Sequence, residues 1–200
     1  REGIAVTEKQ CRQPMGMNKR DHIATMLCMP EIAKQWAVAK GRAAEDSDID
    51  ELYARFVPLQ IEVLPHFNVL IEGVRDALFR LMDMDIKIAF TTGYSREMTD
   101  IVTAGLATQD VIADAVFCAS DVTEGRPKPW MIHRAMEALD VCPPSRVLKI
   151  GDTIADIMSA VNAGCMSVGV YATGNLLGMN EEAFRNLDPE TREDSLSNAR

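Results

Sequence analysis

Two aspartates, four residues apart, carry the strongest chemical signal in the sequence. Asp152 and Asp156 follow Gly151 and the apolar run Val147–Ile150, a pattern typical of a buried strand that leads into a helix. The two carboxylates would share one helix face at the carboxyl end of a parallel strand, where ligands bind in open sheets. Hard oxygen ligands at such an edge favour Mg²⁺ and phosphoryl chemistry. The alternative is helix capping, in which Asp152 or Thr153 is the N-cap and Asp156 completes a capping box.

A second polar turn follows the predicted strand Ile86–Phe90. Thr92 and Gly93 stand where this strand would lead into a helix. A hydroxyl and the exposed N–H groups of a helix start can together hold a phosphate. The alternative is an ordinary turn in which Ser95 caps the helix that begins at Arg96.

Two prolines stiffen the basic loop around Arg126. Pro127 and Pro129 fix φ and bias the residues before them to extended conformations, so Arg126 and Lys128 would be held in set positions. A guanidinium can bind a phosphate or a carboxylate through two hydrogen bonds. For Lys128 we favour a solvated loop. The position of Arg126 between the hydroxyl turn and the paired aspartates favours a functional role.

A lysine begins a predicted helix near the N-terminus. Asn18 can cap a helix over Lys19–Cys28, which puts Lys19 at the positive end of the helix dipole. This position and desolvation both disfavour the ammonium form, and a neutral lysine forms Schiff bases with carbonyls. His22, one turn further along the same face, could transfer protons. The alternative is a charged surface turn with Asp21.

The elements that would position these residues fall into two regions. Residues 1–66 contain only helical patterns and predict a helical cap. Residues 67–200 alternate helices with short apolar strands, which predicts parallel βαβ units. The fold class is therefore α/β, a Rossmann-like parallel-sheet core with an N-terminal helical cap. The predicted elements are helices at 2–11, 19–28, 30–40, from Ser47 onward, 74–82, 96–106, 130–139 and 154–163, and strands at 86–90, 113–119, 147–150 and 167–170.

Composition excludes several partners. The net charge of −9 and the pI near 4.9 disfavour nucleic acids and anionic membrane surfaces. No apolar run is long enough to span a membrane, and no signal peptide is visible. The five scattered cysteines form no C-x-x-C pair and indicate reduced thiols, so we expect a cytoplasmic protein.

The order of these motifs resembles a known superfamily. Thr92 at a strand end, a basic residue and then Gly-Asp-x-x-x-Asp are similar to three motifs of the haloacid dehalogenases. More narrowly, four segments resemble the phosphonatase (phosphonoacetaldehyde hydrolase) family: 14–22, 91–98, 125–131 and 151–153. The resemblance covers nearly the whole chain. It is specific because ordinary phosphatases of the superfamily lack the lysine motif of the cap.

This resemblance implies an enzyme that hydrolyses the carbon–phosphorus bond of phosphonoacetaldehyde, in 2-aminoethylphosphonate degradation. It implies that Lys19 forms a Schiff base with the aldehyde and that acetaldehyde and phosphate are the products. The implied site residues are His22, Met15 and Tyr94 on the cap side, Thr92, Gly93 and Arg126 at the phosphonyl group, and Asp152, supported by Asp156, at Mg²⁺. The family also tends to form homodimers through the cap.

The resemblance further predicts elements that the 200 residues do not contain. Members of the family begin with a strand whose aspartate attacks phosphorus and binds the metal, and they continue with a further strand and helix. We therefore expect a fragment without both ends, inactive and poorly stable by itself.

Two alternatives to this function stay open. One is a phosphatase or phosphomutase acting on C–O–P esters, with Lys19 on the cap surface. The other is a non-catalytic remnant that binds a phosphonate or phosphate.

Overall fold

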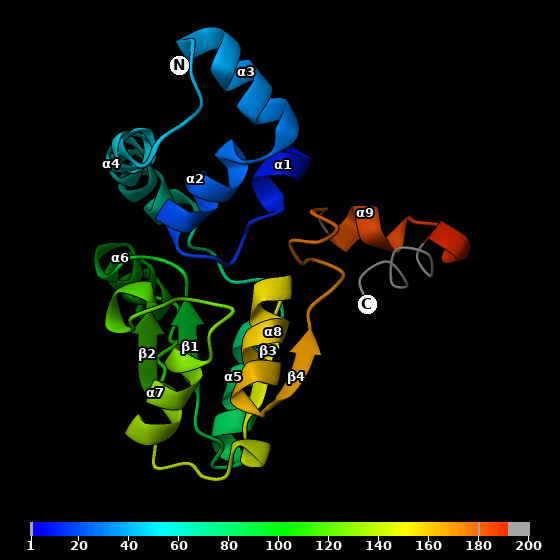
Figure 1. The fold of residues 1–200 in the computed structure, drawn as a ribbon. Helices are drawn as coiled ribbons and strands as arrows, with labels where there is room; N and C mark the ends of the chain where they lie inside the picture. Colours follow the sequence, from blue (N-terminus) through cyan, green and yellow to red (C-terminus); the bar gives the residue numbers. More distant parts are fainter. Residues whose placement is uncertain (1, 180, 192–200) are drawn as a thin grey trace.

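The structure, a computed structural model, describes residues 2–179 and 181–191. Helices alone make up its N-terminal part, and strands alternate with helices in the part that follows (Figure 1). The strand arrows point toward the N-terminal helices, so the carboxyl ends of the strands face the cap. None of the helices in the described ranges is both long and apolar enough to cross a bilayer.

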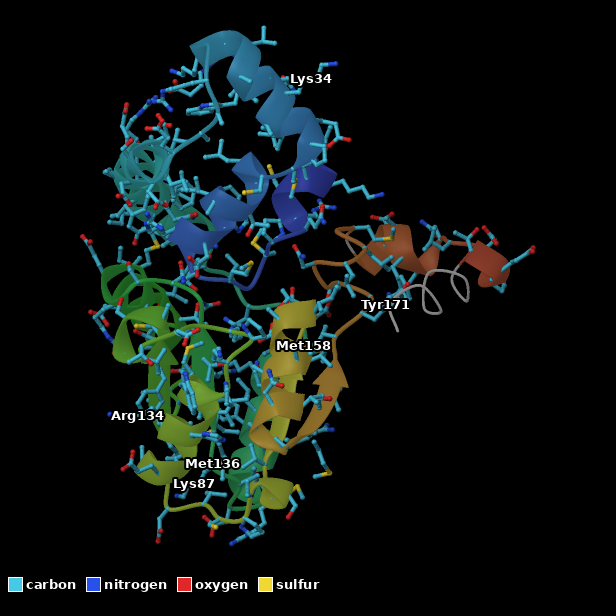
Figure 2. All side chains as sticks on the ribbon, viewed as in Figure 1. Lys34, Lys87, Arg134, Met136, Met158 and Tyr171 are labelled. Atoms are coloured by element: carbon cyan, nitrogen blue, oxygen red, sulfur yellow. The ribbon has the colours of Figure 1, made fainter. Side chains whose placement is uncertain are left out.

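The cap contains four helices and a short 3₁₀ turn. They are α1 (Glu8–Arg12), α2 (Lys19–Leu27), α3 (Pro30–Lys40), α4 (Asp46–Val63) and η1 (Leu64–Phe67). A small apolar core holds the cap together, because Leu27, Met29, Ile32 and Trp36 are buried against one another. Lys34 extends from the outer side of α3 into solvent (Figure 2).

Local capping chemistry explains where the cap helices begin and end. Gly41, at a φ of +71°, ends α3 at the predicted residue. The helix that the sequence predicts from Glu2 begins only at Glu8, because Thr7 forms a capping box that starts α1 there. Ser47 is not the cap of α4, since Glu45 takes that position.

The described part of the core contains four strands and the helices that connect them. In chain order the elements are α5 (Val74–Asp83), β1 (Ala89–Thr92), α6 (Arg96–Ala107), β2 (Ala115–Cys118), η2 (Ala119–Asp121), α7 (Trp130–Ala138), η3 (Pro144–Arg146), β3 (Leu148–Gly151), α8 (Ile154–Ala163) and β4 (Met166–Gly169). A short helix, α9 (Glu181–Arg185), follows. All the strand pairs are parallel, as the alternation of helix and strand predicts.

The strands pair as two separate ladders. β1 pairs with β2 from Ala89↔Ala115 onward, and β3 pairs with β4 from Leu148↔Met166 onward. Within the described residues no ladder joins β1 to β3, so the single sheet expected from the sequence is divided. The expected burial of β3 is also incomplete: α8 packs against it, but Leu148 and Ile150 are 51% and 50% exposed.

Candidate active site at the junction of cap and core

Glycines let the loop before α2 lie directly on the core. Gly16 adopts a φ of +90°, and a Cβ there would approach the Cβ of Thr153 to 3.1 Å. Thr153 is the residue that caps α8. Gly93, just after β1, lies so close to the loop that a Cβ would meet the carbonyl oxygens of Gly16 and Met17. Gly93 therefore permits a backbone contact, and Gly16 a contact with the Thr153 side chain, that any other residue would disturb.

Lys19 stands at this junction as the first residue of α2. Asn18 caps the helix, accepting a hydrogen bond from the backbone N–H of Asp21 at 2.9 Å. The Lys19 ammonium lies 4.9 Å from the centre of the Tyr94 ring. Burial lowers the pKa of Lys19, and the positive charge of Arg126 lowers it further. More of its amine is thus unprotonated near neutrality than in a solvated lysine.

His22 lies one turn along α2. Burial and the charge of Lys19 lower the pKa of His22 to about 4, although a hydrogen bond with the Cys11 backbone acts against this shift. Its Nδ1 is buried and has no hydrogen-bond partner among the described residues. The imidazole is therefore neutral at pH 7 and has a nitrogen that can accept a proton. Met15 lies half-buried in the loop next to Gly16.

The turn after β1 carries the hydroxyl that the sequence singled out. Thr92 ends the strand, and its Oγ1 accepts the Tyr94 N–H at 3.2 Å. The Thr92 hydroxyl hydrogen therefore stays available to a ligand oxygen. Ser95 caps α6, as one reading of the sequence predicted. Burial raises the pKa of Tyr94, so its phenol stays protonated at neutral pH.

Three buried charges meet at Asp156. The Arg126 and Asp156 side chains form an ion pair and are only 8% and 4% exposed. Lys149 Nζ binds the same oxygen, Asp156 Oδ1, at 2.7 Å. Thr153 donates its hydroxyl to Asp156 Oδ2 at 2.7 Å. Burial acts to raise the pKa of Asp156, but the charges of Arg126 and Lys149 outweigh it and hold that pKa below its ordinary value.

Asp152 has a different environment from Asp156. It follows β3 and is exposed, and its Oδ2 accepts the Asn175 N–H at 3.0 Å. Among the described residues, no three His, Cys, Asp or Glu side chains are grouped to hold a metal. Mg²⁺ usually takes only one or two carboxylates, together with water and substrate oxygens. Asp152 fits this requirement, whereas both oxygens of Asp156 already accept hydrogen bonds.

Most of the residues singled out in the sequence meet at this junction. Lys19 lies against the ring of Tyr94. Arg126 lowers the pKa of Lys19 and forms an ion pair with Asp156. Sequence reasoning missed Lys149, which was counted as part of an apolar strand. A charged residue inside a predicted buried strand is the signal that could have identified it, because such residues need a partner.

The likeness to known proteins covers both the cap and the core. A family model described as haloacid dehalogenase-like hydrolase matches residues 1–164. A phosphonoacetaldehyde hydrolase of Bacillus cereus is 39% identical over 192 residues, which cover 96% of this chain and 73% of that protein. One from Paraburkholderia xenovorans is 39% identical over 94% of this chain and 70% of that protein. The crystal structure of a phosphonoacetaldehyde hydrolase like protein from Oleispira antarctica matches 99% of this chain and 72% of that chain, with a TM-score of 0.92 and 32% identity.

Proposed function

Because the chain belongs to the phosphonoacetaldehyde hydrolase family of haloacid dehalogenase-like hydrolases, we propose that it hydrolyses phosphonoacetaldehyde to acetaldehyde and phosphate. The observation that carries this proposal is the partly desolvated amine of Lys19 in the electrostatic field of Arg126. An amine whose pKa is lowered by a guanidinium matches a substrate that carries an aldehyde and a phosphonyl group on neighbouring carbons. A solvated lysine on the outer face of the cap would supply neither the nucleophile nor this proximity.

The first step we propose is imine formation at Lys19. Its unprotonated Nζ adds to the aldehyde carbon, and water leaves to give an iminium. His22 is neutral because its pKa is about 4, and its unpartnered Nδ1 can act as a weak base during this exchange. The iminium is a cation, so the face of the Tyr94 ring can stabilise it as it does the Lys19 ammonium.

The second step breaks the carbon–phosphorus bond. The bonding electron pair moves toward the iminium and forms an enamine, so no free carbanion develops. Phosphorus gains the oxygen of one water molecule, and the enamine carbon gains a proton. Hydrolysis of the resulting imine returns acetaldehyde and the free amine of Lys19. The net reaction consumes one water, since imine formation and imine hydrolysis cancel.

The remaining residues would bind and orient the phosphonyl group. The Thr92 hydroxyl and the Gly93 N–H can donate to its oxygens, and Arg126 can offset its charge. Mg²⁺, when bound, would further neutralise these oxygens, and Asp152 is the residue that would hold it. We assign Asp156 a supporting role because its two oxygens already hold Lys149, Arg126 and Thr153.

A lysine-to-arginine exchange tests the chemistry apart from the charge. Arginine keeps the positive charge but stays protonated and cannot form the imine. In protein produced from its complete gene, Lys19→Arg should abolish acetaldehyde release from phosphonoacetaldehyde. Lys34→Arg, on the exposed side of α3, is the matched control and should behave as the parent. Turnover by Lys19→Arg near the parent rate would contradict the proposal and favour an ordinary phosphatase, which simple C–O–P esters would then reveal.

A further inference from the structure

Lys149 and Arg126 share one carboxylate oxygen, although they come from separate parts of the core. Lys149 lies in β3 and Arg126 in the loop before α7, yet both bind Asp156 Oδ1. The side chains of all three are mostly buried, with Lys149 13% exposed. Two positive charges therefore face one negative charge, and the cluster keeps a net charge of +1.

Within the described residues no second carboxylate forms an ion pair with this cluster, although the charge of Asp152 acts on Lys149 from further away. The Nε of Arg126 is buried and makes no hydrogen bond among these residues. Without Lys149, Arg126 and Asp156 would form a closed pair whose charges cancel. An oxyanion would then have to compete with Asp156 for the guanidinium. With Lys149 on the same oxygen, Asp156 is shared, and the guanidinium keeps part of its attraction for a ligand.

We propose that Lys149 is a positioning residue that keeps Asp156 from neutralising Arg126, so that the guanidinium can bind the phosphonyl group. This inference rests on the proposed function, which assigns the phosphonyl oxygens to Arg126. A purely structural role would be to tie β3 to α8, since Lys149 Nζ also donates to the Ile150 carbonyl at 2.9 Å. The two roles differ in one respect: only the proposed role requires the charge of residue 149 to set the affinity for an anion.

Inorganic phosphate is the probe that separates the two roles. Its affinity is measured by calorimetry, without turnover, for the parent and for Lys149→Met, Lys149→Gln and Lys149→Arg. The Met variant leaves Asp156 paired with Arg126, and the Gln variant can still donate a hydrogen bond to it. Lys128→Met is the matched control, because Lys128 is an exposed lysine in the same loop as Arg126.

We expect both neutral variants to bind phosphate at least about tenfold more weakly than the parent. Lys149→Arg should restore binding to within about threefold, and Lys128→Met should change it less than about twofold, as is usual for an exposed charge. Parent-like affinity in a folded neutral variant would overturn the inference, and so would an Arg variant as weak as the Met variant.

A further variant distinguishes failure of this inference from failure of the proposed function. If Arg126→Met loses phosphate while the Lys149 variants bind as the parent does, only the role of Lys149 is wrong. If the parent binds phosphate no better than Arg126→Met, the anion site itself is wrong, and the proposed function falls with it.

Discussion

Asp156 is the residue on which the buried charges of the site depend. It holds Arg126 and Lys149 together, and Thr153 completes its hydrogen bonds. Asp156→Asn should lower the free energy of unfolding by about 3–5 kcal/mol, because it leaves two buried cations without their carboxylate. Urea denaturation of the variant beside the parent measures this loss. A variant as stable as the parent would show that the cations are solvated or paired elsewhere.

Asp152 should show the opposite behaviour. It is exposed and, among the residues that the structure describes, bonds only to the Asn175 backbone, so Asp152→Asn should change the stability by less than about 1 kcal/mol. Its loss should weaken Mg²⁺ binding more than the loss of Asp156 does, because Asp152 is the available carboxylate. Mg²⁺ titration of both variants tests the order. Equal losses of Mg²⁺ affinity would contradict it.

The sequence indicated candidate residues for the site, but not the interactions between them. Motif spacing pointed to Lys19, Thr92 and Asp152, which lie at the start of a helix or at the end of a strand. The prolines of its loop pointed to Arg126. Spacing cannot tell which charges pair across separate segments. The bond from Lys149 to Asp156 depends on how α8 packs on β3, and no local pattern encodes that packing.

At the scale of the elements, the contact between cap and core depends on small residues. A Cβ on Gly93 would meet the backbone oxygens of Gly16 and Met17 in the loop before α2, here called the cap loop. A Cβ on Gly125 would lie 3.8 Å from Asn18, which is an ordinary contact. Gly93→Ala should therefore displace the cap loop and reduce kcat/KM at least about tenfold, while Gly125→Ala should stay within about twofold. Steady-state kinetics on the complete protein compare the two. Equal effects would mean that the glycine contact does not set the position of the cap.

Helices were easier to predict than strands. α3 and α8 have the predicted bounds because a proline or threonine begins each and a glycine in the left-handed region ends it. β1 was predicted at residues 86–90 and lies at Ala89–Thr92. An apolar run does not fix which residues pair, and here the side chain of Asp114 binds the Ile88 N–H just before the ladder begins.

For the whole molecule, His22 makes the stability depend on pH. Its pKa is about 4 in the folded protein and near 6.5 when unfolded, so between these values the unfolded chain binds the extra proton. Stability should therefore fall as the pH drops from 7 to 5, by about 1 kcal/mol after allowance for partial exposure. Urea midpoints at both pH values measure it, with His22→Asn as the control. An equal loss in His22→Asn would assign the effect to other groups.

The overall architecture follows from the alternation of patterns along the chain, but the joining of the strands does not. The sequence predicted a helical cap before parallel βαβ units, and the structure has this order. The apolar runs alone do not show that the described strands form two ladders, because pairing depends on which strands are neighbours in space. The cytoplasmic location and the homodimer stay predictions from the sequence.

The central claim is that Lys19 forms a covalent imine with the aldehyde of the substrate, and borohydride trapping tests it most directly. Borohydride reduces an imine to a stable amine, so protein from the complete gene, treated with phosphonoacetaldehyde and borohydride, should lose activity and gain one adduct. Peptide mass spectrometry should locate this adduct on Lys19, and Lys19→Arg should gain none. An adduct on another lysine, or full activity after reduction in the presence of substrate, would contradict the claim.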